Sequence, residues 1–182
     1  MTFATTSILV HCTAQCRIAS PLGTMLLART ESGLAGAWFE KQKHHPEAID
    51  APERADDPLL AATARQLHAY FDGGIDAFDV PLDLQGTAFQ RDVWQALLRI
   101  EVGATRSYGD IARELGLPSA SRAVGSAVGR NPVSIIVPCH RVVGSSGALT
   151  GYAGGLDRKT SLLRIEADRV RRRRDARQLE LH

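Results

Sequence analysis

The 182-residue chain contains few cysteines and few aromatic residues: it has three cysteines, and Phe, Trp and Tyr together make up 5% of the sequence. Three cysteines cannot all pair with one another, and a free reactive thiol needs a reducing compartment. No apolar stretch approaches the roughly 18 residues that would span a membrane. Residues 1–10 have no charged segment before their short apolar patch, so no signal peptide is expected. Cytoplasmic localisation is the resulting expectation.

The chain also lacks a strong net charge, but its two parts differ in sign. The formal net charge is +2, whereas residues 1–86 hold 6 Lys/Arg against 11 Asp/Glu, and residues 87–163 hold 9 against 5. A polyanion would be attracted to the second part and not to the first, although a solvated surface can show such a difference by chance. The 44% hydrophobic content is enough for a core, in one domain of ordinary size or in two small ones.

Residues 135–141, Ile-Ile-Val-Pro-Cys-His-Arg, carry the strongest functional signal. The apolar run 135–137 is typical of a buried strand, and it ends at Pro138 directly before Cys139 and His140. A thiol becomes a good nucleophile as a thiolate, and a neighbouring base or positive charge lowers its pKa from about 8.5. The segment therefore predicts a reactive cysteine. The alternative is a small apolar residue that fills space at the end of a strand.

Residues 1–86 show the pattern of a small α+β unit. Residues 17–28 indicate two strands around a turn at 20–23, and residues 36–39 indicate another strand. Residues 41–58 contain three prolines and many charges, so a loop is expected there. Apolar residues recur at helical spacing over 59–71 until Gly73 and Gly74, and residues 78–84 alternate like a strand before a link near residues 85–86.

Residues 87–168 show a mainly helical pattern. Thr87 and Gln90 form a capping box at the start of a helix that continues to Leu98. A second helix begins at residues 107–110 and ends at Gly116, and residues 119–130 predict a third. The second and third helices have the size and spacing of a helix-turn-helix.

The third of these helices consists largely of small side chains. Of residues 120–129, seven are Ala, Ser or Gly, and Arg122 alone is long and charged. Small side chains allow a helix to approach another surface closely. Composition alone favours packing against the protein's own core over approach to a ligand.

Several separated motifs together resemble one known family. Asn131-Pro132 precedes the Pro-Cys-His-Arg core, and the segments 142–144, 151–155, 158–159 and 162–166 follow it. This order resembles the O6-alkylguanine-DNA alkyltransferases, the methylated-DNA–protein-cysteine methyltransferase family, strongly over residues 87–166 and more loosely over the first 86. The resemblance implies a ribonuclease-H-like α+β domain over residues 1–86. It also implies a mainly helical catalytic and DNA-binding domain, with a winged-helix-like helix-turn-helix, over residues 87–168.

The resemblance further implies a reaction. Such a protein transfers the alkyl group of O6-alkylguanine, or of O4-alkylthymine, in DNA irreversibly to its own cysteine, so each molecule reacts once and no cofactor is needed. The damaged base must first be rotated out of the duplex. The expected partner is double-stranded DNA that contains an alkylated guanine and is bound through its minor groove. The protein is expected to act as a monomer, without a metal and without a membrane.

Site residues follow from the resemblance by position. In the implied relay Glu166 bonds His140, which withdraws the proton of Cys139 through a water, while Asn131 holds the turn. Arg122 is expected to fill the gap left by the flipped nucleotide. Many relatives have serine at the position of Ala153, so a side-chain contact is lost there. The implied DNA contacts are Tyr108, Ser121, Arg122, Ala123 and Gly125, and the implied base pocket consists of Tyr152, the amide of Ala153 and the carbonyls of Cys139 and Val142.

Alternatives remain at this point. A thiol hydrolase could use Cys139 and His140, although adjacent residues of an extended chain point to opposite sides. A DNA-binding module without chemistry would explain the helix-turn-helix, although noncatalytic relatives lack the cysteine. Zinc at Cys12 and Cys16 with nearby histidines (His11, His44, His45) is disfavoured because Cys-x-x-x-Cys is a weak zinc pattern. Residues 169–182 are expected to be a basic, disordered tail whose charge run is solvated.

Overall fold

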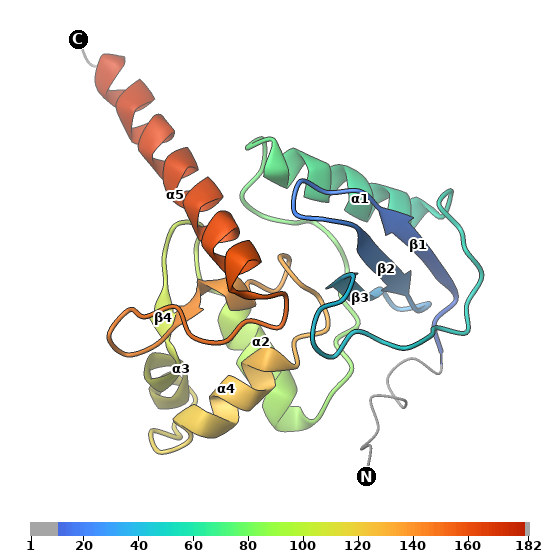
Figure 1. Ribbon diagram of the computed structural model, residues 1–182, viewed down its shortest axis with the longest axis horizontal. Coiled ribbons are helices and arrows are strands. Elements are labelled where there is room, and N and C mark those ends of the chain that lie inside the picture. Colours follow the sequence, from blue (N-terminus) through green and yellow to red (C-terminus); the bar gives the residue numbers. More distant parts are fainter. Residues whose placement is uncertain (1–10, 181–182) are drawn as a thin grey trace.

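The computed structural model describes residues 11–180, which form a sheet-and-helix unit beside a helical unit (Figure 1). The first unit contains β1 (Ala14–Ile18), β2 (Met25–Arg29), β3 (Leu34–Phe39) and α1 (Pro58–Phe71). Its strands are antiparallel in the order β1-β2-β3, and Ile18 lies opposite Met25 across the expected turn. All six residues of β3 are buried. Strand β3 lies at the edge of this order, but isolated bridges join its outer side to Leu82 and Val133. Because it is covered there and buried along its whole length, it shows no alternation of polar and apolar residues.

The second unit contains three short helices: α2 (Ala88–Leu98), α3 (Tyr108–Glu114) and α4 (Ser121–Gly129). The capping box of Thr87 and Gln90 is present, and Ser107 forms a second one with Asp110 at the start of α3. The indole Nε1 of Trp94 on α2 donates to the carbonyl of Ala127 on α4, 2.9 Å away. The expected fold class, an α+β unit followed by a mainly helical unit with a helix-turn-helix, is confirmed.

Two expected strands are absent from the described residues. Residues 78–84 make only one isolated bridge, between Leu82 and Leu34. Pro81 accepts from the amide of Leu34 through its carbonyl, but a proline has no amide with which to extend the ladder. Residues 135–137 form a buried turn, and Ile135 has a positive φ of 73°. This turn is followed by η1 (Cys139–Arg141), a single 3-10 turn, and by β5 (Val142–Val143), which pairs in parallel with β4 (Arg106–Ser107).

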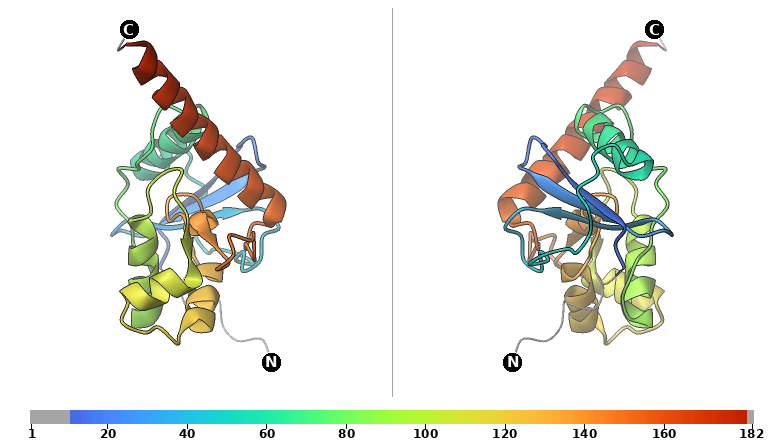
Figure 2. Two further views of the ribbon diagram at one scale, coloured as in Figure 1. Left: turned by 90° about the vertical axis from the view of Figure 1, so that its left-hand side faces the viewer. Right: turned by 90° about the vertical axis from the view of Figure 1, so that its right-hand side faces the viewer.

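The expectation of a disordered tail after residue 168 is wrong for the part of it that the structure describes. Helix α5 runs without interruption over Leu156–Leu179 and projects from the body, as Figures 1 and 2 show. Arg169 is buried rather than solvated: it donates to the carbonyl of Ile75 at 2.6 Å and pairs with Asp76 at 2.9 Å. These contacts anchor the middle of the helix, and helical propagation from an anchored turn is favourable for a sequence rich in arginine.

Candidate active site

The reactive-cysteine segment lies between the two units. Cys139 and His140 occupy the 3-10 turn η1, not an extended chain, and every residue from 131 to 143 is buried. The argument that adjacent residues must point to opposite sides therefore does not apply to this pair. The turn begins after Pro138, and the amide of Cys139 donates to the carbonyl of Val137 at 2.8 Å.

Asn131 holds this turn from within. Its Nδ2 donates to the carbonyl of Val137 at 2.8 Å, to that of Val133 at 3.3 Å, and to Sγ of Cys139 at 3.0 Å. Its Oδ1 accepts from the amide of Val133 at 3.0 Å. One amide side chain thus closes the loop 131–139 and directs a donor at the sulfur, where negative charge would develop if the thiol ionised.

Burial dominates the acidity of the thiol. It raises the pKa of Cys139 to about 11, although the hydrogen bond from Asn131 and the charge of Lys159 act in the opposite direction. The expectation that a neighbouring base gives a low thiol pKa is therefore wrong for this structure, because desolvation disfavours the thiolate more than its neighbours favour it. A reaction at this sulfur has to remove the proton as it proceeds.

A base stands next to the thiol in sequence and is oriented by a carboxylate. Nε2 of His140 lies 2.8 Å from Oε1 of Glu166 on α5, and both side chains are fully buried. Nδ1 of His140 is buried and has no hydrogen-bond partner among the described residues. Burial lowers the pKa of His140 despite the opposite effect of Glu166, so its imidazole is neutral at pH 7. Since Nε2 faces a carboxylate, the proton resides there and Nδ1 is left as the acceptor.

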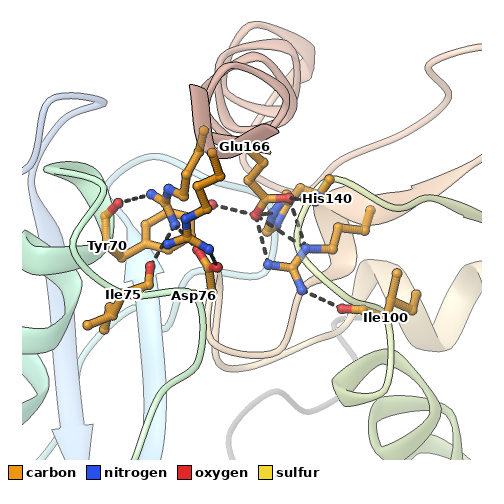
Figure 3. Close-up of polar contacts among 10 residues, drawn as sticks. Tyr70, Ile75, Asp76, Ile100, His140 and Glu166 are labelled. Carbon is orange, nitrogen blue, oxygen red and sulfur yellow. Dashed lines mark hydrogen bonds and ion pairs between the residues drawn. The ribbon is translucent and has the colours of Figure 1, made fainter. Parts of the chain in front are cut away.

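Glu166 is the centre of a larger network, drawn in Figure 3. Arg141 donates to it through Nε and Nη2, at 3.0 Å to Oε2 and 2.8 Å to Oε1, and also donates to the carbonyl of Ile100 at 2.5 Å. The hydroxyl of Tyr70, from α1 of the first unit, donates to Oε1 at 2.6 Å. Burial would raise the pKa of Glu166, but the hydrogen bonds and charges of His140 and Arg141 hold it well below its usual range, so the group is a carboxylate.

A cavity of about 590 Å³ opens beside Cys139. Tyr108, Gly125, Tyr152 and Ala153 line it together with Cys139. Gly125 faces the ring of Tyr108, and a Cβ at this glycine would lie 3.6 Å from that ring. The hydroxyl of Tyr152 is buried without a partner among the described residues. The structure thus brings together five of the residues that the sequence assigned to the base pocket and the DNA contacts.

The remaining assigned residues lie at the edge of the site or behind it. Ser121, Arg122 and Ala123 form the first turn of α4, outside the lining of the cavity, and Arg122 and Ala123 are exposed. The opposite face of α4, with Val124, Ala127 and Val128, is buried. Both explanations for the small residues of this helix therefore apply: one face packs on the core, and the other is open to a ligand.

Sequence reasoning assigned no role to Lys159, which lies behind the cavity. It is fully buried, and its Nζ donates to the carbonyls of Val142 at 2.5 Å, Thr150 at 2.7 Å and Gly151 at 3.4 Å. It thereby fastens the loop that carries Tyr152 to β5. Its sequence signals are its place in the motif at residues 158–159 and its position one turn into a helix that follows a glycine-rich segment. Tyr70 was likewise assigned only to the apolar face of its helix.

The first unit contributes positive charge to the cavity although its net charge is negative. Lys41 and Lys43 line the opening together with Arg130 of the second unit, and the amide of Lys43 donates to the carbonyl of Ala153 at 2.9 Å. The distribution of charge along the sequence therefore does not predict the distribution of charge around the cavity. Among residues 11–180 no group of three His, Cys, Asp or Glu side chains could hold a metal ion, and no helix there is long and apolar enough to cross a membrane.

Two family models match the chain. One is the 6-O-methylguanine DNA methyltransferase, DNA binding domain, over residues 88–168, and the other is the 6-O-methylguanine DNA methyltransferase, ribonuclease-like domain, over residues 16–84. The first model includes Asn131, Cys139, His140 and Glu166, and the second includes Tyr70. Both units of the fold are thus accounted for.

Individual relatives agree with the models. The chain is 49% identical over 153 residues to the methylated-DNA–protein-cysteine methyltransferase of Mycobacterium tuberculosis, covering 84% of this chain and 92% of that protein. It is 51% identical over 147 residues to the methyltransferase of the same name from Methanosarcina acetivorans, covering 81% and 94%. A crystal structure of Mycobacterium tuberculosis OGT in complex with DNA superposes with a TM-score of 0.79 at 48% identity, covering 86% of this chain and 94% of that one.

Proposed function

The chain belongs to the 6-O-methylguanine DNA methyltransferase family, and we propose that it repairs DNA by moving the alkyl group of O6-alkylguanine onto Cys139. The observation that carries this assignment is the group of buried polar side chains around the thiol of Cys139. Asn131 donates to Sγ at 3.0 Å, and the neighbouring imidazole is held by Glu166 at 2.8 Å. Cys139 also lines a cavity of about 590 Å³, which is large enough for a purine base.

The reaction is an in-line displacement. The proton of the Cys139 thiol passes to Nδ1 of His140, through a water, as sulfur attacks the alkyl carbon. The bond between that carbon and O6 breaks, its electron pair leaves with the guanine, and the guanine takes up one proton in exchange for the one that the thiol released. Glu166 stabilises the imidazolium, and the amide of Asn131 stabilises the developing thiolate. Each molecule reacts once because a thioether is inert to mild hydrolysis, and no cofactor takes part.

Access to the base requires that the nucleotide leave the duplex. Tyr152 and the amide of Ala153 then contact the flipped base, together with the carbonyls of Cys139 and Val142. Tyr108 crowds the nucleotide's phosphate, and Arg122 enters the vacated space from the minor groove. The small residues on this side of α4, which are half-buried (Ser121, Gly125) or exposed (Ala123), permit close approach. Alkylated thymine is a second candidate substrate of the same site.

The compartment follows from the chemistry of the acceptor. All three cysteines, Cys12, Cys16 and Cys139, are free thiols. An acceptor thiol stays reactive only where it is kept reduced. We therefore place the protein in the cytoplasm, associated with DNA.

Mass spectrometry tests the assignment directly. Incubation with duplex DNA that carries one O6-methylguanine should add one methyl group to the protein, on the peptide that contains Cys139. Cys139→Ala should abolish transfer and still bind DNA, while Cys12→Ser and Cys16→Ser should transfer normally. A methyl group recovered on Cys12 or Cys16, or turnover of an ester substrate in place of single transfer, would contradict the assignment.

A further inference from the structure

The relay carboxylate has a donor that comes from outside the catalytic unit. Tyr70 lies near the end of α1, and its hydroxyl donates to Oε1 of Glu166 at 2.6 Å. The same oxygen lies 2.8 Å from Nε2 of His140 and 2.8 Å from Nη2 of Arg141. Oε2 has separate donors, the Nε of Arg141 at 3.0 Å and the amide of Gly103 at 3.3 Å. Tyr70 therefore bonds the oxygen that orients the base.

The position of Tyr70 is itself fixed. The guanidinium of Arg169, one helical turn after Glu166 on α5, lies 4.8 Å from the centre of the Tyr70 ring and also donates to its backbone carbonyl. The ring of Phe78 lies 5.5 Å from the Tyr70 ring on another side. Figure 3 shows the polar contacts by which Tyr70, Ile75 and Asp76 are joined to side chains of α5. Such bracing is more than packing of an apolar ring requires.

We propose that Tyr70 is a positioning residue for alkyl transfer: its hydroxyl holds Oε1 of Glu166 where that oxygen accepts from Nε2 of His140, so that Nδ1 is presented to the thiol. The α+β unit thereby completes the relay. This inference rests on the proposed function of Cys139. It assigns to the first unit a part in the chemistry, in addition to the loop contacts that it makes at the opening of the cavity.

The sign of the effect on His140 follows from competition for one oxygen. Burial and the negative charge of Glu166 raise the pKa of the Tyr70 hydroxyl far above its usual value, so it acts as a donor at every working pH. A donor on Oε1 disperses the charge that would stabilise an imidazolium at His140. The other groups that act on His140 are Glu166, Arg141 and Lys159, and the substitution Tyr70→Phe leaves all three in place. Loss of the hydroxyl should therefore raise the pKa of His140 and free the carboxylate to move.

The first test is the pH dependence of single-turnover transfer in Tyr70→Phe. We expect the rate at pH 7 to fall about fivefold, which corresponds to one hydrogen bond of ordinary strength. The acid limb of the profile should move to higher pH by roughly half a unit. Both effects should be equal on duplex DNA and on the free alkylguanine base, since the relay acts after the base is bound. An unchanged rate and profile in the folded variant would overturn the proposal.

Two further arms separate positioning from packing. Phe78→Leu, a matched control in the same ring cluster without a polar contact to Glu166, should lower stability and leave the pH profile in place. Site-specific 3-fluorotyrosine at position 70 keeps the shape and makes the hydroxyl a stronger donor. It should move the acid limb to lower pH, opposite in sign to Tyr70→Phe. A shift of the same sign, or none, would count against the role of the hydroxyl.

Histidine NMR provides a measure that does not depend on transfer. The imidazole of His140 should carry its proton on Nε2 in the wild-type protein and should titrate at higher pH in Tyr70→Phe. If His140 titrates at different pH in the two proteins but the wild-type protein transfers no alkyl group, the proposed function fails and the positioning by Tyr70 stands. If transfer occurs and the titration is the same in both proteins, the inference about Tyr70 fails alone.

Discussion

Buried polar side chains set the chemistry at the scale of single residues. Asn131, Lys159 and Glu166 are all removed from solvent, and each of them makes at least three hydrogen bonds in the described structure. A buried group with several partners is costly to alter because its partners are left unsatisfied. These residues therefore combine structural and electrostatic roles, and substitution should change both stability and reactivity.

Lys159→Gln separates these two roles. Loss of the charge removes an influence that lowers the pKa of the Cys139 thiol, so transfer at pH 7 should slow and should recover partly as the pH rises toward 9. Loss of the donors to three backbone carbonyls, of which that of Val142 is buried, should reduce the free energy of unfolding by about 2 kcal/mol. Transfer rates across pH and urea denaturation measure the two effects.

Arg158→Gln is the matched control, since Arg158 is the neighbouring cation and also bonds backbone carbonyls, those of Leu22 and Gly154. Arg158 is not among the groups that act on the pKa of Cys139. Arg158→Gln should lower stability, but its transfer rate should not show the recovery at high pH that is expected for Lys159→Gln. Equal pH profiles for the two variants would mean that the charge of Lys159 does not reach the sulfur.

Helix α4 shows how one element serves two surfaces. Val124, Ala127 and Val128 face the core, and Arg122 and Ala123 face solvent. One face of this nine-residue helix packs against α2 and α3, and the other is the face that we propose approaches DNA, so small side chains suit both. A substitution on the exposed face of α4 should therefore separate recognition of the lesion in DNA from the transfer reaction at Cys139.

Arg122→Ala tests that separation. If the guanidinium fills the space of the flipped nucleotide, transfer from duplex DNA should slow by roughly tenfold or more, since unstacking a base requires a few kcal/mol. Transfer from the free alkylguanine base should be nearly unchanged. Arg113→Ala, an exposed arginine on α3 that pairs with Asp110, is the matched control. Equal losses on both substrates would assign Arg122 to the fold rather than to base flipping.

At the scale of the whole molecule, the two units share one core and one site. A single hydrophobic cluster includes Met25 and Leu60 of the first unit as well as Val93 and Val124 of the second. The first unit also reaches the relay through Tyr70 and the cavity through Lys43. We therefore expect the described body to unfold as one cooperative unit, with a pH dependence set by its buried titratable groups.

Stability should fall as the solution is acidified from pH 7.5 to 5.5. The folded-state pKa of His140 is lowered, so below its unfolded value of about 6.5 the unfolded chain binds a proton that the folded chain does not. Glu166 acts in the same direction at lower pH, because its folded-state pKa is also lowered. Urea denaturation at several pH values measures the slope. His140→Gln should flatten it, and an unchanged slope in that variant would contradict the assignment to His140.

The projecting end of α5 allows a prediction about the DNA footprint. Arg172, Arg174 and Arg177 are exposed there, and Figures 1 and 2 place this end of the helix at the opposite end of the molecule from α4. Replacing all three with glutamine should change affinity for a short duplex less than twofold and leave its salt dependence intact. Fluorescence anisotropy at several salt concentrations measures both. A smaller salt slope would show that this end of α5 contacts the same DNA as α4.

The sequence alone determined the features that depend on local pattern: the capping box at Thr87, the hairpin around residues 20–23, the helix-turn-helix, and the Pro-Cys-His-Arg motif that indicates the family of the chain. It could not determine what depends on distant residues. Tyr70 and Glu166 are 96 positions apart, and their contact exists only because α1 and α5 pack at one place. Tertiary burial also reversed the expected acidity of the thiol, since desolvation depends on everything that surrounds Cys139. Anchoring of Arg169 by Asp76 and Ile75 likewise turned an expected disordered tail into a helix, because only the folded first unit supplies those partners.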